Sequence, residues 1–586
     1  MNNSQVAEVF ENIADLLELK GEIPFKVRAY RRAAQAIEHL PQEIAQLRRE
    51  DKLRTIPGVG EAIAKKVQEL VDTGKLAYYE NLRGEFPEGV LKLMEVPGIG
   101  PKTAARLYKE LGITSVDALE QAILSGQVAS LPRLGEKTAE NILKSIQSLR
   151  RKDQRTPLGQ ALPVVENIMG ALKGTSGLHV LAPAGSLRRL AETVGDIDLM
   201  GTADDPPRVL DAFSRLPLVK QVLVQGPKKV SVLVDGGLQV DLRLVEPDSF
   251  GSLIQYFTGS KQHNIVLREW ANRKGLSLNE YGITHLDTEV LEKFATEEAF
   301  YSRLGLQYIP PEIREGTNEI ELAEQGKLPN LVEVGDIRGD LHVHTEWSDG
   351  HASLEEMALA AQRRGYEYVA LTDHSAGRGI ARGLNEERRR QQLSEIAELN
   401  SRLAGKIRVL SGMEVDIRAD GTLDCPDELM AEVDVVVGAV HSSMGQDREK
   451  MTARVISAMR DPHVDIVAHP TCRLLGEREP VDIDMEAVFQ VAVETGTALE
   501  INAMPPRLDL KDVHARRARD LGVKLVISTD SHSPDHLGFM RYGVGVARRG
   551  WCRPEDILNT RLLAEFLALL HRGKQVIPSP SGRGLG

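Results

Sequence analysis

The chain has little cysteine, no long apolar run and no surplus of positive charge. Its 586 residues include three cysteines, which are too few and too scattered for a disulfide framework and fit a reducing compartment. No stretch approaches the roughly 18 consecutive apolar residues of a membrane helix. The first residues predict an acidic amphipathic helix instead of a secretion signal. We therefore expect a cytoplasmic protein without a membrane partner.

The net charge of −12 is unusual for a protein that binds nucleic acid. Residues 1–160, however, carry about as many basic as acidic side chains, so the acidic excess lies in the remainder. Carboxylates that hold metal ions would contribute to such an excess. Charge alone therefore neither supports nor excludes DNA, and the length suggests roughly three or four domains.

The most informative segment runs from Gly185-Ser186 to Asp196-Ile197-Asp198. Two carboxylates one residue apart on a strand point to the same face, where divalent cations can hold them together. A Gly-Ser turn just upstream can present backbone N–H groups to phosphate. Asp241, on a strand of a hairpin predicted around Asp235-Gly236-Gly237, can supply a third carboxylate. This set predicts two-metal phosphoryl transfer.

A second signal repeats within residues 1–150, which are predicted to form short helices. Pro57-Gly58-Val59-Gly60 and Pro97-Gly98-Ile99-Gly100 each precede a helix rich in Ala and Lys. A tight Gly-x-Gly hairpin exposes backbone amides at a helix N-terminus and can bind a DNA phosphate without reading sequence. A single copy is equally a helix cap, but two copies favour DNA binding, with a monovalent cation as a further expected ligand. A third copy has Arg133 in place of glycine, which argues against a phosphate role.

From residue 337 onward, seven apolar strand-like runs are each followed by helical sequence. This alternation predicts a (β/α) barrel with its chemistry at the C-terminal strand ends. Imidazole and carboxylate groups that end or follow these runs suit Zn²⁺, Mn²⁺ or Fe, and they can hold about three ions if Glu414 bridges. The nine candidate ligands are His342, His344, Asp349, His374, Glu414, His441, His469, Asp530 and His532.

Residues 1–315 resemble the family X DNA polymerases, the group that includes DNA polymerase β. The resemblance rests on GSLRRLAETVGDIDLM, VDLRLV and Tyr256-Phe257-Thr258-Gly259-Ser260, and it continues in phase through Asn264 and Arg268. It implies that two Mg²⁺ or Mn²⁺ ions are held by Asp196, Asp198 and Asp241. It also implies that the triphosphate is contacted by Arg155, Gly185, Ser186, Arg189 and Gly195.

The same resemblance implies contacts to the rest of the incoming nucleotide. Tyr256, Phe257 and Gly259 fall where the family contacts the sugar, although both rings can also pack in the core. Asn264 would contact the incoming base and Arg268 the template minor groove. Lys261 replaces an aspartate of the vertebrate enzyme. This lysine either adds attraction for the triphosphate or gives the site without nucleotide a different arrangement from that of the vertebrate enzyme.

The resemblance further implies that the first domain grips the downstream 5′ end of a DNA gap. Lys66 falls where the family can form a Schiff base with an abasic sugar, with Lys26 and Tyr30 at partner positions. Ala62 and Tyr78 replace lysines of the family's 5′-phosphate pocket. We therefore expect gap binding with weak or absent lyase activity, and Lys66 is equally well read as a solvated or phosphate-binding lysine.

Residues 337–575 resemble the PHP (polymerase and histidinol phosphatase) domain through HxHT, SDG, TDH, GxE, AHP and DSH, with all nine ligand positions filled. The resemblance implies an active phosphoesterase holding Zn²⁺ and/or Mn²⁺. It groups His342, His344, Glu414 and Asp530 on one ion, Asp349, His374 and His532 on a second, and Glu414, His441 and His469 on a third. Arg378 and Arg382 are candidate phosphate contacts or ordinary solvated loop residues.

The sequence thus predicts a multidomain chain with a helical helix-hairpin-helix region, an α+β nucleotidyltransferase palm with a thumb, and a (β/α)7-type PHP barrel. The expected boundaries are 1–90 and 91–154 for the helical regions, 155–250 for the palm, 251–315 for the nascent-base-pair subdomain, 316–336 for a linker and 337–575 for the barrel. The expected function is that of a bacterial family X polymerase.

Such a polymerase would fill short gaps during base excision repair, with a 3′–5′ exonuclease or 3′-end-processing activity in the barrel. Its expected partners are gapped or nicked DNA and dNTPs, and we expect a monomer. Two alternatives are a small-molecule phosphatase with an inert N-terminal half, and a non-catalytic scaffold for DNA ends. The intact ligand sets argue against both.

Overall fold

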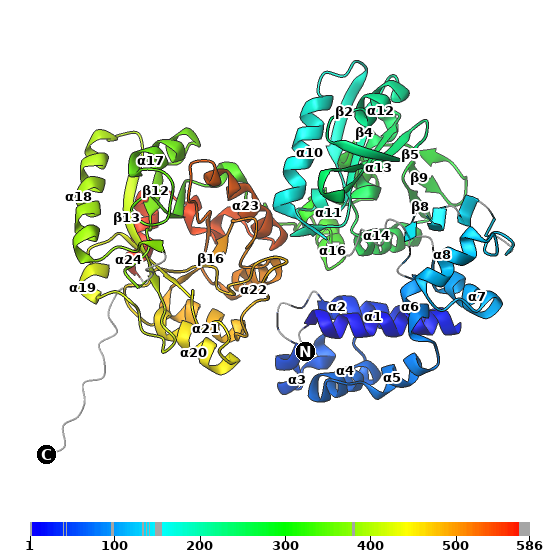
Figure 1. Ribbon diagram of the computed structural model, residues 1–586, viewed down its shortest axis with the longest axis horizontal. Coiled ribbons are helices and arrows are strands. Elements are labelled where there is room, and N and C mark those ends of the chain that lie inside the picture. The colour runs from blue at the N-terminus through cyan, green and yellow to red at the C-terminus, as the bar shows by residue number, and fades with distance from the viewer. Residues whose placement is uncertain are drawn as a thin grey trace. The chain divides into compact units, whose positions relative to one another are not determined.

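The computed structural model describes residues 3–572, apart from residues 39, 41, 43, 95, 97, 98, 132, 133, 136, 140, 144, 147–154 and 378–380. The chain divides into two compact units, Met1–Arg155 and Thr156–Gly586 (Figure 1). None of the helices in the described part of the chain combines the length and the apolar character that a membrane span requires.

The first unit is built from short helices around one apolar core. Phe10, Ile13 and Leu17 of α1 recur at helical spacing and are fully buried, so that α1 presents one apolar stripe to its neighbours. Gly60 and Gly100 end the two clear hairpin repeats and cap α4 and α7. The helices are α1 (Asn3–Lys20), α2 (Pro24–Glu38), α3 (Ile44–Arg49), α4 (Glu61–Thr73), α5 (Ala77–Gly84), α6 (Glu88–Met94), α7 (Pro101–Leu111) and α8 (Val116–Leu124).

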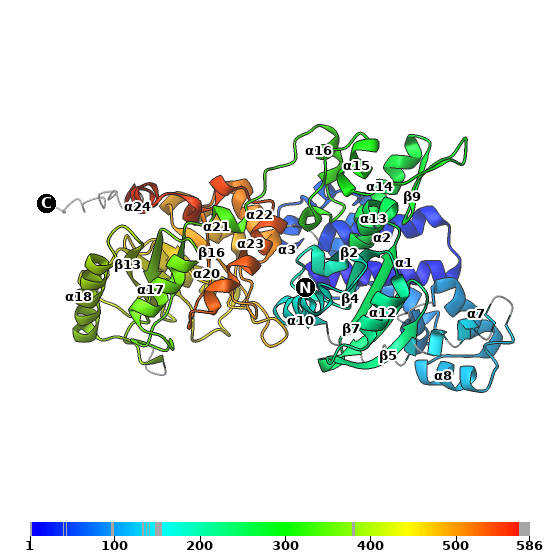
Figure 2. The same ribbon diagram turned by 90° about the horizontal axis from the view of Figure 1, so that it is seen from above.

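The second unit begins with a five-stranded sheet in the order β2-β4-β7-β6-β5. Its strands are β2 (Leu178–Pro183), β4 (Ile197–Ala203), β5 (Val219–Gln225), β6 (Lys229–Val234) and β7 (Gln239–Val245). The predicted hairpin is β6–β7, and β7 lies parallel to β4. Helices α10 (Leu158–Leu172) and α12 (Pro206–Ser214) pack on one face and α13 (Phe250–Thr258) on the other (Figure 2).

Strand alternation decides which side chains of β4 meet which helices. Ile197 and Leu199 join the core under α10 and α12, whereas Met200 packs with Leu253 of α13. Asp198 therefore points to the α13 side of the sheet, because side chains two residues apart share a face.

A smaller layer follows, with α14 (Lys261–Arg273), the antiparallel strands β8 (Leu276–Asn279), β9 (Gly282–His285) and β10 (Leu291–Glu292), and α15 (Glu297–Arg303). Residues 316–336, interpreted from the sequence as a linker, contain α16 (Glu319–Glu324) and bury Ile320 and Leu331 in the core of this layer. The fully buried Glu319 is paired with His263 of α14 over 2.8 Å. This segment is therefore packed instead of extended.

The rest of the unit is a parallel barrel whose seven strands are neighbours in sequence order. They are β11 (Gly339–Val343), β12 (Tyr368–Leu371), β13 (Arg408–Asp416), β14 (Val435–Ala439), β15 (Ile466–Val467), β16 (Ala498–Asn502) and β17 (Leu525–Ser528). A parallel bridge between Val343 and Ser531 nearly closes the ring. The predicted barrel is confirmed.

Helices surround these strands, as Figure 1 shows. They include α17 (Leu354–Arg363), α18 (Glu386–Arg402), α20 (Arg448–Met459), α21 (Met485–Thr495), α22 (Asp512–Leu521) and α23 (Met540–Arg549). Phe566 of α24 (Leu563–Arg572) stacks on Tyr368, at the start of β12, so α24 covers the N-terminal end of the barrel. The opposite end is left for the site.

Asn559 joins the first and last strands at the barrel's base. Its buried side chain donates to the carbonyls of Gly339 and Ile527 and accepts from the N–H of Ile527. We expect Asn559→Ala to lower the free energy of unfolding by about 3 kcal/mol, because it leaves three buried backbone groups unpaired. Urea unfolding followed by circular dichroism measures this loss. The half-exposed Leu562→Ala serves as control, and equal stability of the two variants would contradict the prediction.

Two candidate metal centres

The three predicted carboxylates of the palm come together at the ends of two parallel strands. Asp198 of β4 and Asp241 of β7 are register partners, and Asp196 directly precedes β4. Burial, followed by the charges of Asp196 and Asp241, raises the pKa of Asp198 to about 7. A divalent cation between these groups would remove the repulsion, so the donor set fits the two-metal arrangement.

Two further side chains, not identified from the sequence, hold Asp241. Lys229 Nζ lies 2.5 Å from Oδ2, and Gln239 Nε2 donates to Oδ1 over 2.9 Å. Gln239 could have been found, because it lies two residues before Asp241 on the same strand. Lys229 reaches Asp241 diagonally across the hairpin, which only the register reveals.

The glycine-serine turn directly adjoins the carboxylates. Gly185 and Ser186 open the short helix α11 (Gly185–Arg188), and Gly185 has a φ of +60°. A Cβ on Gly185 would lie 3.0 Å from Asp198 Oδ2, so a side chain at this position would crowd the site. Arg155 precedes β1 (Thr156–Pro157), which pairs antiparallel with β3 (Thr193–Val194) just before Gly195. Arg155 and Gly195 therefore flank the same two-stranded sheet.

Arg189 points back toward the end of α13. Its Nη1 donates to the carbonyl of Thr258 over 2.5 Å, and its Nε donates to Glu315 Oε1 over 3.4 Å. The side chain is only 14% exposed. Gly259 leaves room for this arginine, because a Cβ there would lie 3.3 Å from Nη1.

The residues expected around the sugar and base lie on α13 and α14 or between them. Tyr256 and Phe257 are half-buried with their rings edge to face, so they pack and remain accessible together. Asn264 donates to the carbonyl of Tyr256 over 2.8 Å. Lys261 and Arg268 lie exposed on α14.

In the first unit the expected 5′-end residues form one aromatic and basic cluster. Lys66 Nζ lies 4.7 Å from the ring centroid of Tyr78, which stacks on Tyr30 at 6.0 Å. Lys26 is paired with Glu22 over 3.1 Å. The position where the family has a lysine thus carries an aromatic partner for Lys66. Gly58 has a φ of +82°, whereas Gly98 and Arg133 lie outside the described residues.

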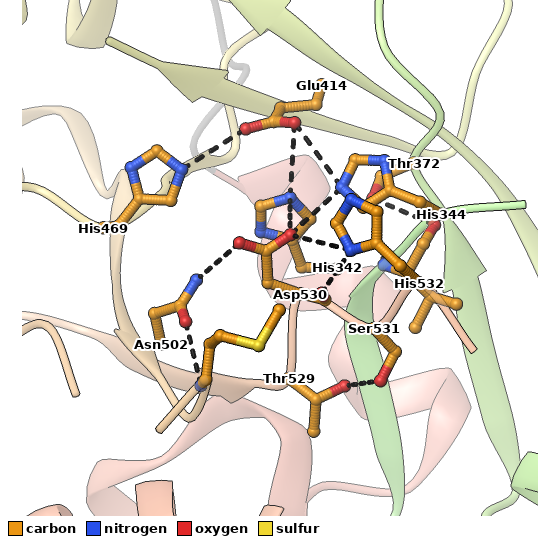
Figure 3. Close-up of polar contacts among 12 residues, drawn as sticks. His342, His344, Thr372, Glu414, His469, Asn502, Thr529, Asp530, Ser531 and His532 are labelled. Atoms are coloured by element: carbon orange, nitrogen blue, oxygen red, sulfur yellow. Dashed lines mark hydrogen bonds and ion pairs between the residues drawn. The ribbon is translucent and has the colours of Figure 1, made fainter. Parts of the chain in front are cut away.

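The nine predicted ligands of the barrel converge at its C-terminal end, and Figure 3 shows six of them. Potential ligand atoms lie within 4.8 Å of one another in three groups. These are His344, Asp349, His374 and His532; His342, His344 and Asp530; and His374, Glu414 and His441. His469 Nε2 lies 3.5 Å from Glu414 Oε1. The groups share His344 and His374, whereas the expected grouping shared Glu414 alone.

Several buried ligand atoms make no well-oriented hydrogen bond, among them Nε2 of His342, both ring nitrogens of His344 and both carboxylate oxygens of Glu414. The Glu414 oxygens do lie 2.8 Å from His374 Nδ1 and 3.1 Å from His441 Nε2. Such buried polar atoms are costly without well-oriented partners, and metal ligation would satisfy them. The donor set of imidazole and carboxylate therefore fits divalent metal ions.

Second partners fix three of the imidazole rings. His342 Nδ1 lies 2.8 Å from Glu500, His441 Nδ1 lies 3.2 Å from Asp416, and His532 Nδ1 lies 2.8 Å from the carbonyl of Asp530. Each contact leaves Nε2 for an ion. The carboxylates of Glu500 and Glu414 raise the pKa of His342 against the effect of burial. Glu500 was not identified from the sequence, because it lies inside the apolar run of β16 and not at its end.

An arginine that was also not identified borders the cluster. Arg507 Nε lies 3.5 Å from Asp530 Oδ2, and the side chain is 19% exposed, so it can reach a bound phosphate. Of the two arginines proposed from the sequence, Arg382 is exposed and Arg378 lies outside the described residues.

Comparison with protein families identifies four domains along the chain. Residues 1–76 match a helix-hairpin-helix domain and residues 90–148 a SAM-like helix-hairpin-helix tandem. Residues 253–315 match the DNA polymerase beta thumb, and residues 340–503 match the PHP domain. The family resemblances of the sequence are confirmed.

Individual relatives cover different shares of the chain. DNA-directed DNA/RNA polymerase mu of Homo sapiens is 26% identical over 53% of this chain and 69% of its own length. A probable phosphatase of Thermoanaerobacter sp. (strain X514) is 28% identical over 38% of this chain and 89% of its own. The DNA polymerase/3′-5′ exonuclease PolX of Bacillus subtilis (strain 168) is 40% identical over 98% of this chain and its full length. With all four domain matches and this full-length similarity, the chain belongs to the PolX family of family X DNA polymerases.

Proposed function

We propose that this protein is a template-directed DNA polymerase that fills short gaps during DNA repair and processes 3′ ends in its barrel. One observation carries the proposal. A cluster of histidines and carboxylates in the barrel and neighbouring carboxylates on β4 and β7 of the palm occur in one chain, which is 40% identical to a DNA polymerase/3′-5′ exonuclease over nearly its whole length. A phosphatase or a DNA-binding scaffold would need only one set or neither.

In the palm, Asp196, Asp198 and Asp241 would hold two Mg²⁺ or Mn²⁺ ions. Such ions lower the pKa of an attacking hydroxyl and neutralise the charge that develops on phosphate. The 3′-hydroxyl of the primer attacks the α-phosphate of a dNTP, and pyrophosphate leaves. Gly185, Ser186, Arg189, Gly195 and Arg155 bind the triphosphate, while Tyr256, Phe257 and Gly259 border the sugar. Asn264 and Arg268 contact the base pair.

In the barrel, the nine ligands would hold about three ions, Zn²⁺ and/or Mn²⁺. Bound ions of this kind activate water and stabilise charge on a phosphoryl group. Glu500 and Asp416 orient the histidines, and Arg507 binds the phosphate oxygens of a 3′ end. The barrel would thus remove nucleotides or blocking groups from the 3′ end that the palm extends.

The first unit would bind gapped or nicked DNA through its hairpin repeats, and the protein would act as a monomer. Lys66 faces Tyr78 instead of a second lysine, which favours binding of the 5′ end over lyase chemistry. A monovalent cation would assist the hairpin carbonyls and amides at Gly58, Gly60 and Gly100.

Asp198→Asn should reduce incorporation on a one-nucleotide gap by about a thousandfold, because the set of carboxylates that would hold the ions loses one of its three members. The same variant should still trim 3′ ends at the wild-type rate. Single-turnover extension of end-labelled gapped DNA measures both activities. Asp204→Asn, a change at an exposed aspartate just after β4, serves as control. Equal extension by both variants would contradict the assignment of the polymerase site.

His344→Ala should abolish 3′ trimming and lower the metal content of the purified protein, because His344 belongs to two of the ligand groups. Gap filling should be unchanged. Elemental analysis and exonuclease assays, before and after a chelator, measure these effects, with the exposed His179→Ala as control. Trimming that survives in His344→Ala would place the nuclease elsewhere. Turnover of histidinol phosphate without turnover of DNA ends would favour a small-molecule phosphatase.

Glu500→Gln tests whether Glu500 orients the predicted metal ligand His342, and it leaves every predicted ligand in place. The amide cannot hold His342 as a carboxylate does, so we expect metal affinity and trimming to fall about 10- to 100-fold. Zinc or manganese titration of metal-depleted protein measures the affinity. The exposed Glu494→Gln should leave it unchanged, and wild-type affinity in Glu500→Gln would contradict the orienting role.

A further inference from the structure

The barrel and the palm share a packed interface within the second unit. One apolar core includes Leu158 and Val165 of α10 together with Leu537 and Val544 near the barrel's last helices. At the start of α10, a Cβ on Gly159 would lie 2.2 Å from Pro505, so backbone and ring are in close contact. The barrel can therefore act mechanically on palm residues.

Three barrel contacts fall on one short palm segment, residues 189–192, which follows the glycine-serine turn. Arg549 Nη1 donates to the carbonyl of Arg189 over 3.0 Å. A Cβ on Gly545 would lie 2.9 Å from Leu190 Cδ1. Arg473 Nη1 lies 2.8 Å from Glu192 Oε2. The barrel thus holds the backbone that carries Arg189.

Arg549 and Arg189 also share one carboxylate, that of Glu315. Arg549 Nη1 donates to Glu315 Oε1 over 2.8 Å, whereas Arg189 Nε donates to the same oxygen over 3.4 Å. Arg549 Nε donates to Asp512 Oδ2 over 2.8 Å, which fixes the other edge of the guanidinium group. Both arginine side chains are at least 86% buried, so their interactions are weakly screened. Because Arg549 makes the shorter contact with Glu315, this carboxylate neutralises the charge of Arg189 only in part.

We propose that Arg549 of the barrel is a positioning residue of the polymerase centre: it binds Glu315 and the backbone of Arg189, and so keeps the Arg189 guanidinium available to the triphosphate of the incoming nucleotide. The inference rests on the proposed function, in which Arg189 contacts that triphosphate. Without Arg549, Arg189 loses its closer competitor for the charge of Glu315, and the segment loses a support. Nucleotide binding weakens, while the carboxylates that hold the ions stay in place.

The neighbouring residue offers a matched control. Arg548 lies on the same helix and in the same interface, but it donates to Glu312 and to the carbonyl of Val332. Arg548 thus holds this interface through partners other than Glu315 and Arg189. Replacing either arginine by methionine keeps the apolar stem and removes the charge.

The experiment is single-nucleotide incorporation on a one-nucleotide gap by the full-length, metal-loaded protein. We expect Arg549→Met to raise KM for the dNTP roughly three- to tenfold with little change in kcat, and Arg548→Met to change KM less than about twofold. In a Glu315→Gln background, the effect of Arg549→Met should largely disappear, because the competing charge is gone. Thermal unfolding and 3′ trimming check the fold, and Arg549→Lys, with an intermediate KM, replaces Arg549→Met if the latter unfolds.

Equal increases in KM for the two methionine variants would overturn the proposal, because a general loss of interface stability would explain them. So would an undiminished effect of Arg549→Met in the Glu315→Gln background. Arg189→Ala separates this failure from a failure of the proposed function. An unchanged KM in Arg189→Ala, or a wild-type protein that adds no nucleotide, would overturn the assignment of Arg189 as a triphosphate contact and the present inference with it.

Discussion

The crowding of ligand atoms at strand ends is the constraint on which both centres depend. In the palm, burial and then the nearby charges of Asp196 and Asp241 raise the pKa of Asp198 to about 7. In the barrel, Glu414 and His344 are buried with polar atoms that make no well-oriented hydrogen bond. Such arrangements are unfavourable without cations and become favourable with them, because each ion replaces repulsion and lost hydration by direct ligation. The folds around them supply the rigidity that keeps the ligands from separating.

Parallel strand pairing produces this crowding in both places. In the palm, β4 and β7 run side by side in register, so that Asp198 and Asp241 meet although they are far apart in sequence. In the barrel, every strand runs in the same direction, and residues that end a strand therefore gather at one rim. Parallel pairing thus brings carboxylates together in both places, near the starts of β4 and β7 in the palm and at the C-terminal rim of the barrel.

Strand pairing also explains how much the sequence could predict. Each barrel ligand ends or follows an apolar run, so His342, Glu414 and Asp530 could be identified one strand at a time, and the seven strands with them. Lys229, which holds Asp241 across a hairpin, depends on strand register and could not. Residues 316–336 were interpreted as a linker because they are polar and contain proline, yet Glu319 is buried against His263. A polar residue with a buried partner cannot be distinguished from a solvated one by local composition.

Arg549, like Lys229 and Glu319, has partners that the local sequence does not reveal. Its helix reads as an ordinary outer helix of the barrel, and nothing in the local sequence relates it to the palm. Its partners Glu315, Asp512 and the backbone of Arg189 come from three separate segments. Because Glu315 lies between two arginines, a movement of α23 would change how far Arg189 is neutralised. The palm segment that carries Arg189 and the barrel helix that carries Arg549 are thus joined by a shared carboxylate as well as by the chain, so electrostatics at their interface can act on the palm.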